Sequence, residues 1–212
     1  MRITKHGHAC VEVDTGQGRL LIDPGTYTEP LDMSGYAAVL VTHQHPDHLD
    51  EERLRAALAD DPGLAVWTNP SVADLLADLG DRVHPVRRGD RFDVAGVDVE
   101  VHGELHALIH PDIPRIANVG FRIGGALFHP GDALTLPDAP LDVLLLPVYA
   151  PWSKVGEVID YVREVGAAHT VAMHNAGLSE VGHRLLDGLM GPNGPGTGTA
   201  YQHLQVGEHI DT

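Results

Sequence analysis

Three histidines and an aspartate lie within residues 43–48, in the order His43, His45, Asp47 and His48. Imidazole nitrogens and carboxylate oxygens are the protein ligands of zinc and related divalent ions, so this density predicts a metal site. His43 and His45 are two positions apart, so in an extended loop both side chains point the same way and can bind one ion together. Asp47 and His48 project differently and suit a second ion.

The segments around this loop predict how it is held. The apolar run 36–41 is typical of a buried strand, and the acidic, Leu- and Ala-rich segment 50–59 is typical of an amphipathic helix. Further strands are expected at 9–13, 19–22, 64–67, 91–94, 97–101, 119–123, 126–128, 143–146 and 170–173, with a short edge strand in the final residues. Further helices are expected at 71–80, with a capping box at Ser71, from about 151 onward, and at 179–190.

Three later strand ends carry the residues that the loop 43–48 lacks. His106, Asp132 and His174 each follow the carboxyl end of an expected strand, where loops on a rigid sheet build sites. An imidazole from His106 would complete the first ion's ligands and His174 the second's, and Asp132 could bridge both ions. His102 is an alternative to His106, but it continues the alternation of its strand, so His106 is favoured.

A second set of residues is expected around these ligands. Asp23 ends a strand, where it either caps a turn or orients a ligand histidine, and the turn is favoured. His8 and His110 either belong to the site or are ordinary strand-start and loop residues, and both interpretations stay open. The residues expected to orient ligands or to line the substrate entrance are His8, Asp23, His110, Arg115, Tyr149 and Trp152.

Composition limits the class of protein. The chain has 212 residues, 43% of them hydrophobic, and is expected to form a single domain over 1–212 with a Gly/Pro-rich loop at 191–199. A net charge of −16 argues against nucleic acid as a partner. One cysteine allows no internal disulfide, and no apolar stretch reaches the length of a membrane span. We expect a cytoplasmic protein with a small-molecule substrate, and self-association stays open.

The motifs resemble those of the metallo-β-lactamase superfamily. Residues 43–48 match its His-x-His-x-Asp-His signature, and His106, Asp132 and His174 match its later motifs. The resemblance covers roughly residues 2–190 and implies an α/β fold, a four-layer αβ/βα sandwich of two mixed sheets flanked by helices, with a dinuclear metal site at one edge. The order of expected strands and helices independently favours two face-to-face mixed sheets.

Two further segments resemble one branch of that superfamily. Residues 7–10 and 21–25 are similar to the branch that contains ascorbate-6-phosphate lactonase-like hydrolases and a phospholipase D relative. The activity expected is hydrolysis of an ester, lactone or phosphoester, in which two zinc ions produce a bridging hydroxide at neutral pH and one ion polarises the substrate oxygen. Asp47 is the expected catalytic residue, because it would orient the nucleophile and could pass a proton to the leaving group.

The charge of such a centre predicts a substrate preference. Two divalent ions, less the charges of Asp47, Asp132 and a hydroxide, leave a net charge of about +1 in an acidic protein, which favours an anionic small molecule. Manganese or iron would fit the same ligands. The alternatives are a mononuclear iron redox enzyme, similar to sulfur dioxygenases, and a non-catalytic metal- or ligand-binding protein, which the complete ligand set disfavours.

Overall fold

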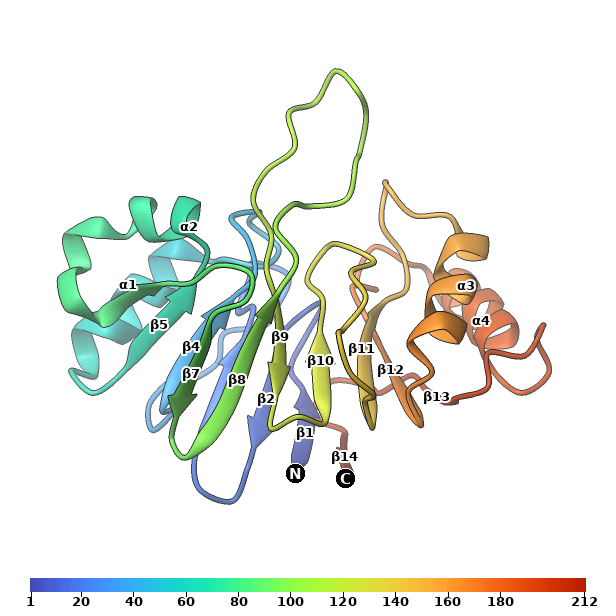
Figure 1. The fold of residues 1–212 in the computed structure, drawn as a ribbon, viewed down its shortest axis with the longest axis horizontal. Helices are drawn as coiled ribbons and strands as arrows, with labels where there is room; N and C mark the ends of the chain where they lie inside the picture. Colours follow the sequence, from blue (N-terminus) through green and yellow to red (C-terminus); the bar gives the residue numbers. More distant parts are fainter.

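Two seven-stranded sheets pack face to face in the computed structural model, which describes residues 1–212, and helices cover the outer face of each sheet (Figure 1). The first sheet, in the order β14-β1-β2-β3-β4-β5-β6, contains β1 (Arg2–Lys5), β2 (Val11–Asp14), β3 (Arg19–Ile22), β4 (Ala38–Val41), β5 (Ala65–Thr68), β6 (Val83–Pro85) and β14 (His209–Asp211). The second sheet, in the order β13-β12-β11-β10-β9-β8-β7, contains β7 (Arg91–Val94), β8 (Val97–His102), β9 (Gly120–Ile123), β10 (Leu127–His129), β11 (Val143–Pro147), β12 (His169–Met173) and β13 (Ala200–Gln202).

Both sheets are mixed, as the sequence predicts. In the first, β1, β2 and β3 are antiparallel and β3 to β6 are parallel. In the second, β7 to β10 are antiparallel and β10 to β13 are parallel. Helices α1 (Glu51–Asp60) and α2 (Pro70–Leu75) lie outside the first sheet, and α3 (Val155–Val165) and α4 (Glu180–Met190) lie outside the second (Figure 1). The predicted α/β sandwich is therefore confirmed.

Three apolar layers hold this arrangement together. Strand β4 shows why, because all four of its residues are buried: Leu40 faces the other sheet, while Val39 and Val41 face the α1 side. A strand covered on both faces reads as a continuous apolar run rather than an alternating one. The third layer lies between β11 and α3 and includes Leu144. Truncating Leu40 to alanine would cost about 2–5 kcal/mol by leaving a cavity between the sheets.

Two helices differ from their expected bounds. The helix expected over 71–80 is present but shorter, because α2 begins after an Asn69 cap and ends at Leu75, and a 3₁₀ segment, Ala77–Arg82, follows. The Asn69 side chain accepts from the backbone N–H groups of Ser71 and Val72, so Ser71 is not the cap. The helix expected from about 151 begins at Val155 instead.

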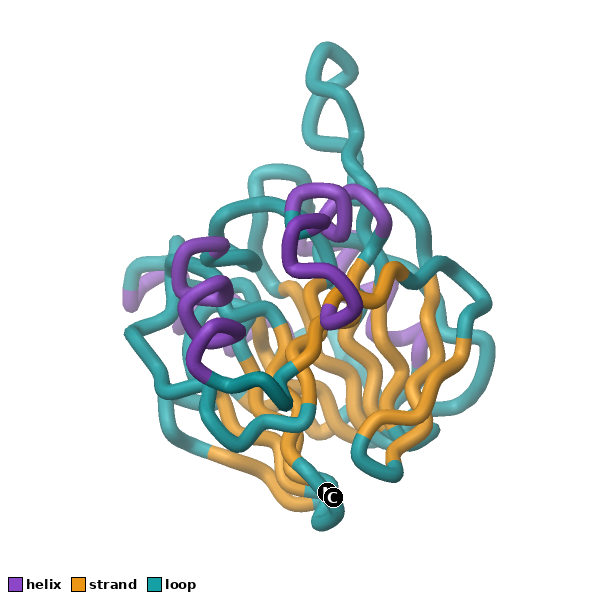
Figure 2. The backbone as a smooth tube through the Cα atoms, turned by 90° about the vertical axis from the view of Figure 1, so that its left-hand side faces the viewer, coloured by secondary structure: helices purple, strands orange, loops and turns teal.

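The strand ends that carry the candidate ligands meet at one edge of the molecule. Beside this edge the segment 103–119, which connects β8 to β9, projects away from the body (Figures 1 and 2). The segment 191–199 contains no helix or strand, and the final residues add β13 and β14 at the edges of the two sheets, as expected. No helix has the length and apolar character that crossing a membrane would require.

Candidate metal centre

The structure brings the seven predicted ligands into one cluster. Three overlapping groups have potential ligand atoms that all lie within 4.8 Å of one another: His43, His45 and His106; His43, His48 and Asp132; and His8, Asp47, His48 and His174. Of the two candidates for the third imidazole, only His106 joins the cluster. His102 points elsewhere, with its ring nitrogens 3.7 Å from Glu100 and 3.5 Å from Asp138.

Two of the clustered histidines are oriented by backbone carbonyl groups. Nδ1 of His106 donates to the carbonyl oxygen of Ala107 at 2.7 Å, and Nδ1 of His174 donates to that of Tyr149 at 2.6 Å. A carbonyl oxygen can only accept, so Nδ1 carries a proton, and in the neutral ring, the form that binds a metal, the lone pair of Nε2 faces the cluster. His174 adopts a left-handed backbone conformation (φ 56°), which turns its side chain into the site at the end of β12.

A buried carboxylate orients two more of the histidines. Asp23 is fully buried, and its Oδ2 accepts from His48 Nδ1 at 2.7 Å and from the hydroxyl of Thr42 at 2.7 Å. The same hydroxyl lies 3.0 Å from His43 Nδ1 and is placed to accept from it. The preference for Asp23 as a simple turn cap is therefore wrong. Gly25 follows it, and a Cβ there would collide with the backbone of Asp47, so the turn packs directly on the ligand loop.

Asp132 lies between the groups of histidines. Its Oδ1 is 3.1 Å from His48 Nε2, and its Oδ2 is 3.0 Å from His174 Nε2 and 3.4 Å from His106 Nε2. The indole Nε1 of Trp152 donates to Oδ2 at 3.1 Å. This position between two groups of imidazoles is what a bridging carboxylate requires.

The electrostatics of the cluster are dominated by these contacts. Burial lowers the pKa of His43 well below its ordinary value. Burial also opposes the charge on His48, but the carboxylates of Asp132 and Asp23 outweigh it and raise the pKa of His48 well above the ordinary value. The pKa of Asp132 is held well below its usual range, against the effect of burial, by His48 and its other imidazole neighbours. The centre therefore favours ionised carboxylates.

The donor atoms fit bound divalent ions. Nε2 of His48, His106 and His174 and Oδ1 of Asp132 are all buried and lack a hydrogen-bond partner within the protein. Buried polar atoms are almost always satisfied, so four such atoms converging on one place indicate a ligand that the protein is built to bind. Three nitrogens and a carboxylate oxygen are suitable donors for zinc, manganese or iron.

His8 differs from the other histidines of the cluster. Its Nδ1 accepts from the backbone N–H of Ala176 at 3.0 Å, so in the neutral ring the proton is on Nε2. That Nε2 is buried and lies 3.2 Å from Oδ2 of Asp47, the acceptor it faces. A nitrogen that carries a proton has no lone pair for a metal. His8 is therefore placed as a hydrogen-bond donor into the site.

The remaining predicted residues lie around the entrance or away from it. His110 is on the projecting segment with 61% of its side chain exposed, and nothing joins it to the cluster. Arg115 donates from Nε to the carbonyl oxygen of His106 at 2.8 Å, and the ring of Tyr149 is 43% exposed. Sequence reasoning missed Thr42 and Asn118, whose amide oxygen accepts from the backbone N–H of Asp132 at 3.0 Å. Thr42 directly precedes the ligand loop, and that adjacency was the available signal.

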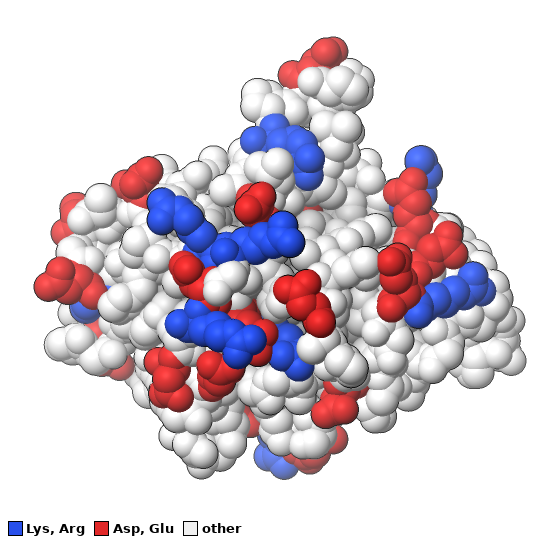
Figure 3. Space-filling model, in the orientation of Figure 1, with Lys and Arg blue, Asp and Glu red and all other residues white.

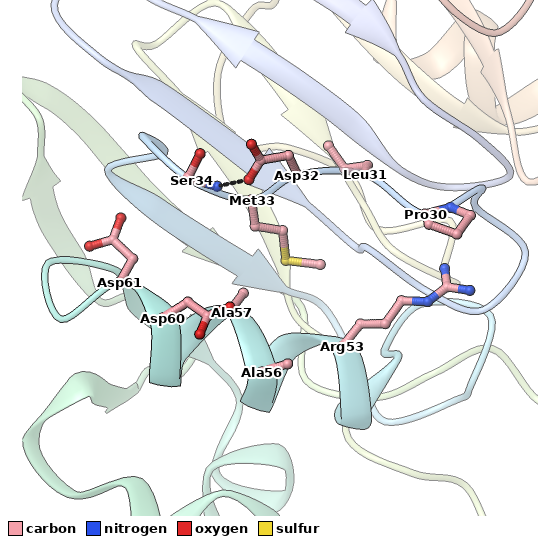
Figure 4. Close-up of a pocket in the computed structure, with 10 residues that line it drawn as sticks. All are labelled: Pro30, Leu31, Asp32, Met33, Ser34, Arg53, Ala56, Ala57, Asp60 and Asp61. Carbon is pink, nitrogen blue, oxygen red and sulfur yellow. Dashed lines mark hydrogen bonds between the residues drawn. The ribbon is translucent and has the colours of Figure 1, made fainter.

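A separate hollow of about 340 Å³ lies between residues 30–34 and α1 (Figure 4). Met33 extends between the two segments, and Arg53 is the only basic residue of the lining. The guanidinium of Arg53 is already used, since it lies 3.0 Å from Asp50 and donates to the carbonyl oxygen of Thr28. No candidate ligand lines this hollow, so it is not part of the metal centre.

Comparison with known proteins agrees with this geometry. Residues 2–174 match the family model described as the beta-lactamase superfamily domain. Protein Rv0786c of Mycobacterium tuberculosis is 42% identical over 182 residues, which cover 83% of this chain and 84% of that protein. A UPF0173 metal-dependent hydrolase of Methanosphaerula palustris is 32% identical, over 70% of this chain and 71% of that protein. The solved structure of Igni18, a metallo hydrolase of Ignicoccus hospitalis, has a TM-score of 0.72 at 16% identity, and the match covers 99% of this chain and 97% of that one.

Two mixed sheets between outer helices, with a histidine- and aspartate-rich centre at one edge, define a metal-dependent hydrolase of the metallo-β-lactamase fold. The chain belongs to the beta-lactamase superfamily, and it shares its domain with the UPF0173 metal-dependent hydrolases. The family, the fold and the hydrolase class predicted from the sequence are thereby confirmed. The branch assignment from residues 7–10 and 21–25 stays a prediction.

Proposed function

We propose that this hydrolase uses a dinuclear centre, with zinc as the preferred metal, to cleave an ester, lactone or phosphoester bond. The supporting observation is the convergence of four buried, unpartnered donor atoms between two groups of imidazoles. In this proposal His43, His45 and His106 would hold one ion, Asp47, His48 and His174 would hold the second, and Asp132 would be shared between them. Bound ions would supply Lewis-acid polarisation of the substrate and a nucleophilic water at neutral pH.

The protein's own groups would handle the proton that this hydrolysis moves. Asp47 is the most exposed carboxylate of the centre, with 22% of its side chain accessible, so it can reach both a bound water and a leaving group. His174 and His8 hold the pKa of Asp47 well below its usual range, although burial opposes them. Asp47 is therefore ionised in the resting site, where it would accept the hydrogen bond of an attacking water, and His8 holds it in place from Nε2.

The preferred substrate is proposed to be anionic. Arg115 supports this, because its Nε is fixed to the carbonyl oxygen of the ligand His106 and its guanidinium lines the entrance. The adjoining hollow is lined by Arg88 and Arg115 but also by Glu104 and Asp138, so its charges are balanced and it adds nothing to the preference. We also propose a cytoplasmic location, since Cys10 is a free, buried thiol.

Metal content and hydrolysis measured together test this function. Purified protein should contain two ions per chain. It should cleave members of a panel of lactones, phosphodiesters, carboxylic esters and thioesters, and it should prefer the anionic members. Asp132→Ala and His174→Ala should lose metal and activity, whereas Asp138→Ala, at an exposed carboxylate outside the cluster, should keep both. Activity that survived both ligand substitutions would refute the site. One iron per chain with oxygen uptake would instead support the redox alternative, and full metal without any turnover the binding protein.

A further inference from the structure

The projecting segment 103–119 exposes apolar side chains where a loop would ordinarily be polar. Leu105, Leu108, Ile109 and Ile113 are 45%, 51%, 37% and 47% exposed. In Figure 3 this projection is mostly white, with acidic atoms at its tip and basic atoms nearer its base. Large apolar residues gathered on one exposed segment usually mark a binding surface. Charged residues are 21% of the chain, so the apolar character of this segment does not reflect a general shortage of charged side chains.

The apolar side chains continue directly into the metal centre. A shallow depression of about 20 Å³, with room for little more than a water molecule, is lined by His45 and His106 together with Ile109, Ile113 and Ile116. His106 belongs to the same segment, so the arm that carries the apolar residues also carries a proposed ligand. An apolar group that packs on the surface of Ile109 and Ile113 would therefore lie beside two of the proposed metal ligands.

Exposed aromatic rings form other parts of the entrance. Tyr149 is 43% exposed, and the backbone carbonyl oxygen of this residue accepts from His174, a proposed ligand. Tyr27 is 61% exposed and lies 5.3 Å from the ring of His8. Trp152, half-buried, lies edge-on to His106 at 6.0 Å. The entrance thus offers apolar contacts on several sides and one fixed cation, Arg115.

From this surface we infer that the substrate carries an apolar group, an alkyl chain or an aromatic ring, next to the anionic or ester group that is cleaved. Leu108, Ile109 and Ile113 would pack against this apolar group. The inference rests on the proposed hydrolase function and specifies its substrate class. A lipid bilayer is a poorer occupant, because Glu104 and Asp112 lie on the same segment and its one Lys or Arg, Arg115, is held by the carbonyl oxygen of His106.

A series of substrates that differ only in chain length tests this inference. The probes are 4-nitrophenyl acetate, butyrate and hexanoate for turnover, and methylphosphonate and hexylphosphonate for binding by calorimetry. A buried methylene changes a binding constant by about fourfold when fully desolvated, so on a half-open surface kcat/KM should rise about two- to fourfold for each added pair of methylenes. By the same factor, hexylphosphonate, with five more methylenes, should bind about 6- to 30-fold more tightly than methylphosphonate.

Variants locate the effect. Leu108→Ser and Ile113→Ser, combined in one chain, should flatten the dependence on chain length and remove the advantage of hexylphosphonate. Leu185→Ser is the matched control, because Leu185 is 64% exposed on α4 and lies outside the centre, and it should leave both dependences unchanged. Melting curves of all three proteins should agree, since the substituted side chains are exposed.

The outcomes separate the inference from the function on which it rests. Turnover of esters without any dependence on chain length, together with equal binding of the two phosphonates, would overturn the inference and leave the hydrolase intact. Absence of all turnover in metal-loaded protein would count against the proposed function, and the phosphonate titration would still decide on the apolar subsite. Sedimentation with phosphatidylcholine or phosphatidylglycerol vesicles that the double variant abolishes, without a preference for hexylphosphonate, would assign the segment to membrane docking and overturn the inference.

Discussion

Oδ2 of Asp23 lies 2.7 Å from Nδ1 of His48, and both side chains are almost completely shielded from solvent. The Asp23 carboxylate is not one of the candidate ligands but contacts the ring nitrogen of His48 that faces away from the metal centre. It accepts the Nδ1 proton, so Nε2 of His48 faces Asp132, and in the neutral, metal-binding form of the ring this nitrogen carries the lone pair. Through the hydroxyl of Thr42 the same carboxylate also reaches His43. One buried charge thereby sets the orientation of a proposed ligand of each ion.

Replacing Asp23 by asparagine should therefore weaken metal binding without removing a ligand. The amide keeps the shape, but its NH₂ group accepts no hydrogen bond. The bonds that Thr42 and His48 donate to the two carboxylate oxygens can therefore not all be kept, and the affinity should fall about 10- to 100-fold. Competition with a chromophoric chelator measures this. Asp32→Asn is the control, because Asp32 is exposed and accepts only from the backbone N–H of Ser34. Equal affinities in Asp23→Asn and the parent chain would contradict the orienting role.

Two substitutions at His8 distinguish a donor from a ligand. His8→Asn keeps an acceptor for the N–H of Ala176 but loses the group that reaches Asp47, so activity should fall about 10- to 100-fold with metal content unchanged. His8→Gln places an amide near the Nε2 position and should recover part of the loss. Elemental analysis and steady-state kinetics are the measurements. Loss of one ion in His8→Asn would show that His8 is a ligand after all.

Lys5 makes stability depend on pH in the alkaline range. It is buried, donates to the carbonyl oxygen of Ala172 and to the side chain of Asn175, and burial lowers its pKa to about 8. Below pH 8 the Lys5 amine is charged in both the folded and the unfolded chain, so burial of the charged amine destabilises the folded protein to its full extent. Between pH 8 and about 10.5 only the unfolded chain stays protonated, so stability relative to Lys5→Met should rise with pH, by up to about 3 kcal/mol.

Urea unfolding of the parent chain and Lys5→Met at pH 7.5 and pH 10 measures this difference. Lys154→Met serves as the control, because Lys154 is exposed and pairs only with Glu157. A stability difference for Lys5→Met that stays constant with pH would show that Lys5 does not titrate in this range in the folded protein.

Asn69 should contribute more to stability than its neighbour Ser71. Its Oδ1 caps α2, and its Nδ2 donates at 2.9 Å to the carbonyl oxygen of Thr42, next to the ligand loop. Asn69→Ala should therefore lower the free energy of unfolding by about 2 kcal/mol. Ser71→Ala, at an exposed position, should change it by less than about 0.5 kcal/mol. The opposite order in urea unfolding would restore Ser71 as the cap.

Local patterns predicted most of the fold, and they failed where tertiary contacts decide. Val72, Leu75, Leu76 and Leu79 have ideal helical spacing, yet the helix ends at Leu75, which is 47% exposed. Gly80, which the pattern predicts as the end of the helix, instead lies inside the 3₁₀ segment with a non-helical φ of 64°. A local pattern cannot reveal that the Asn69 side chain, at the start of α2, donates to the carbonyl oxygen of Thr42, the residue before the histidine loop 43–48.

The sequence alone determined which residues are proposed to bind metal, because His43, His45, Asp47 and His48 are close in the chain and the other ligands follow strand ends. Tertiary structure decided between His106 and His102 and revealed which carbonyl or carboxylate oxygen accepts the Nδ1 proton of His48, His106 and His174. Ala176 is 168 positions from His8, and Asp23 is 25 from His48, so no local pattern could pair them. The proton of an imidazole sits on the nitrogen that faces an acceptor, and only the folded chain decides which backbone or carboxylate group lies there.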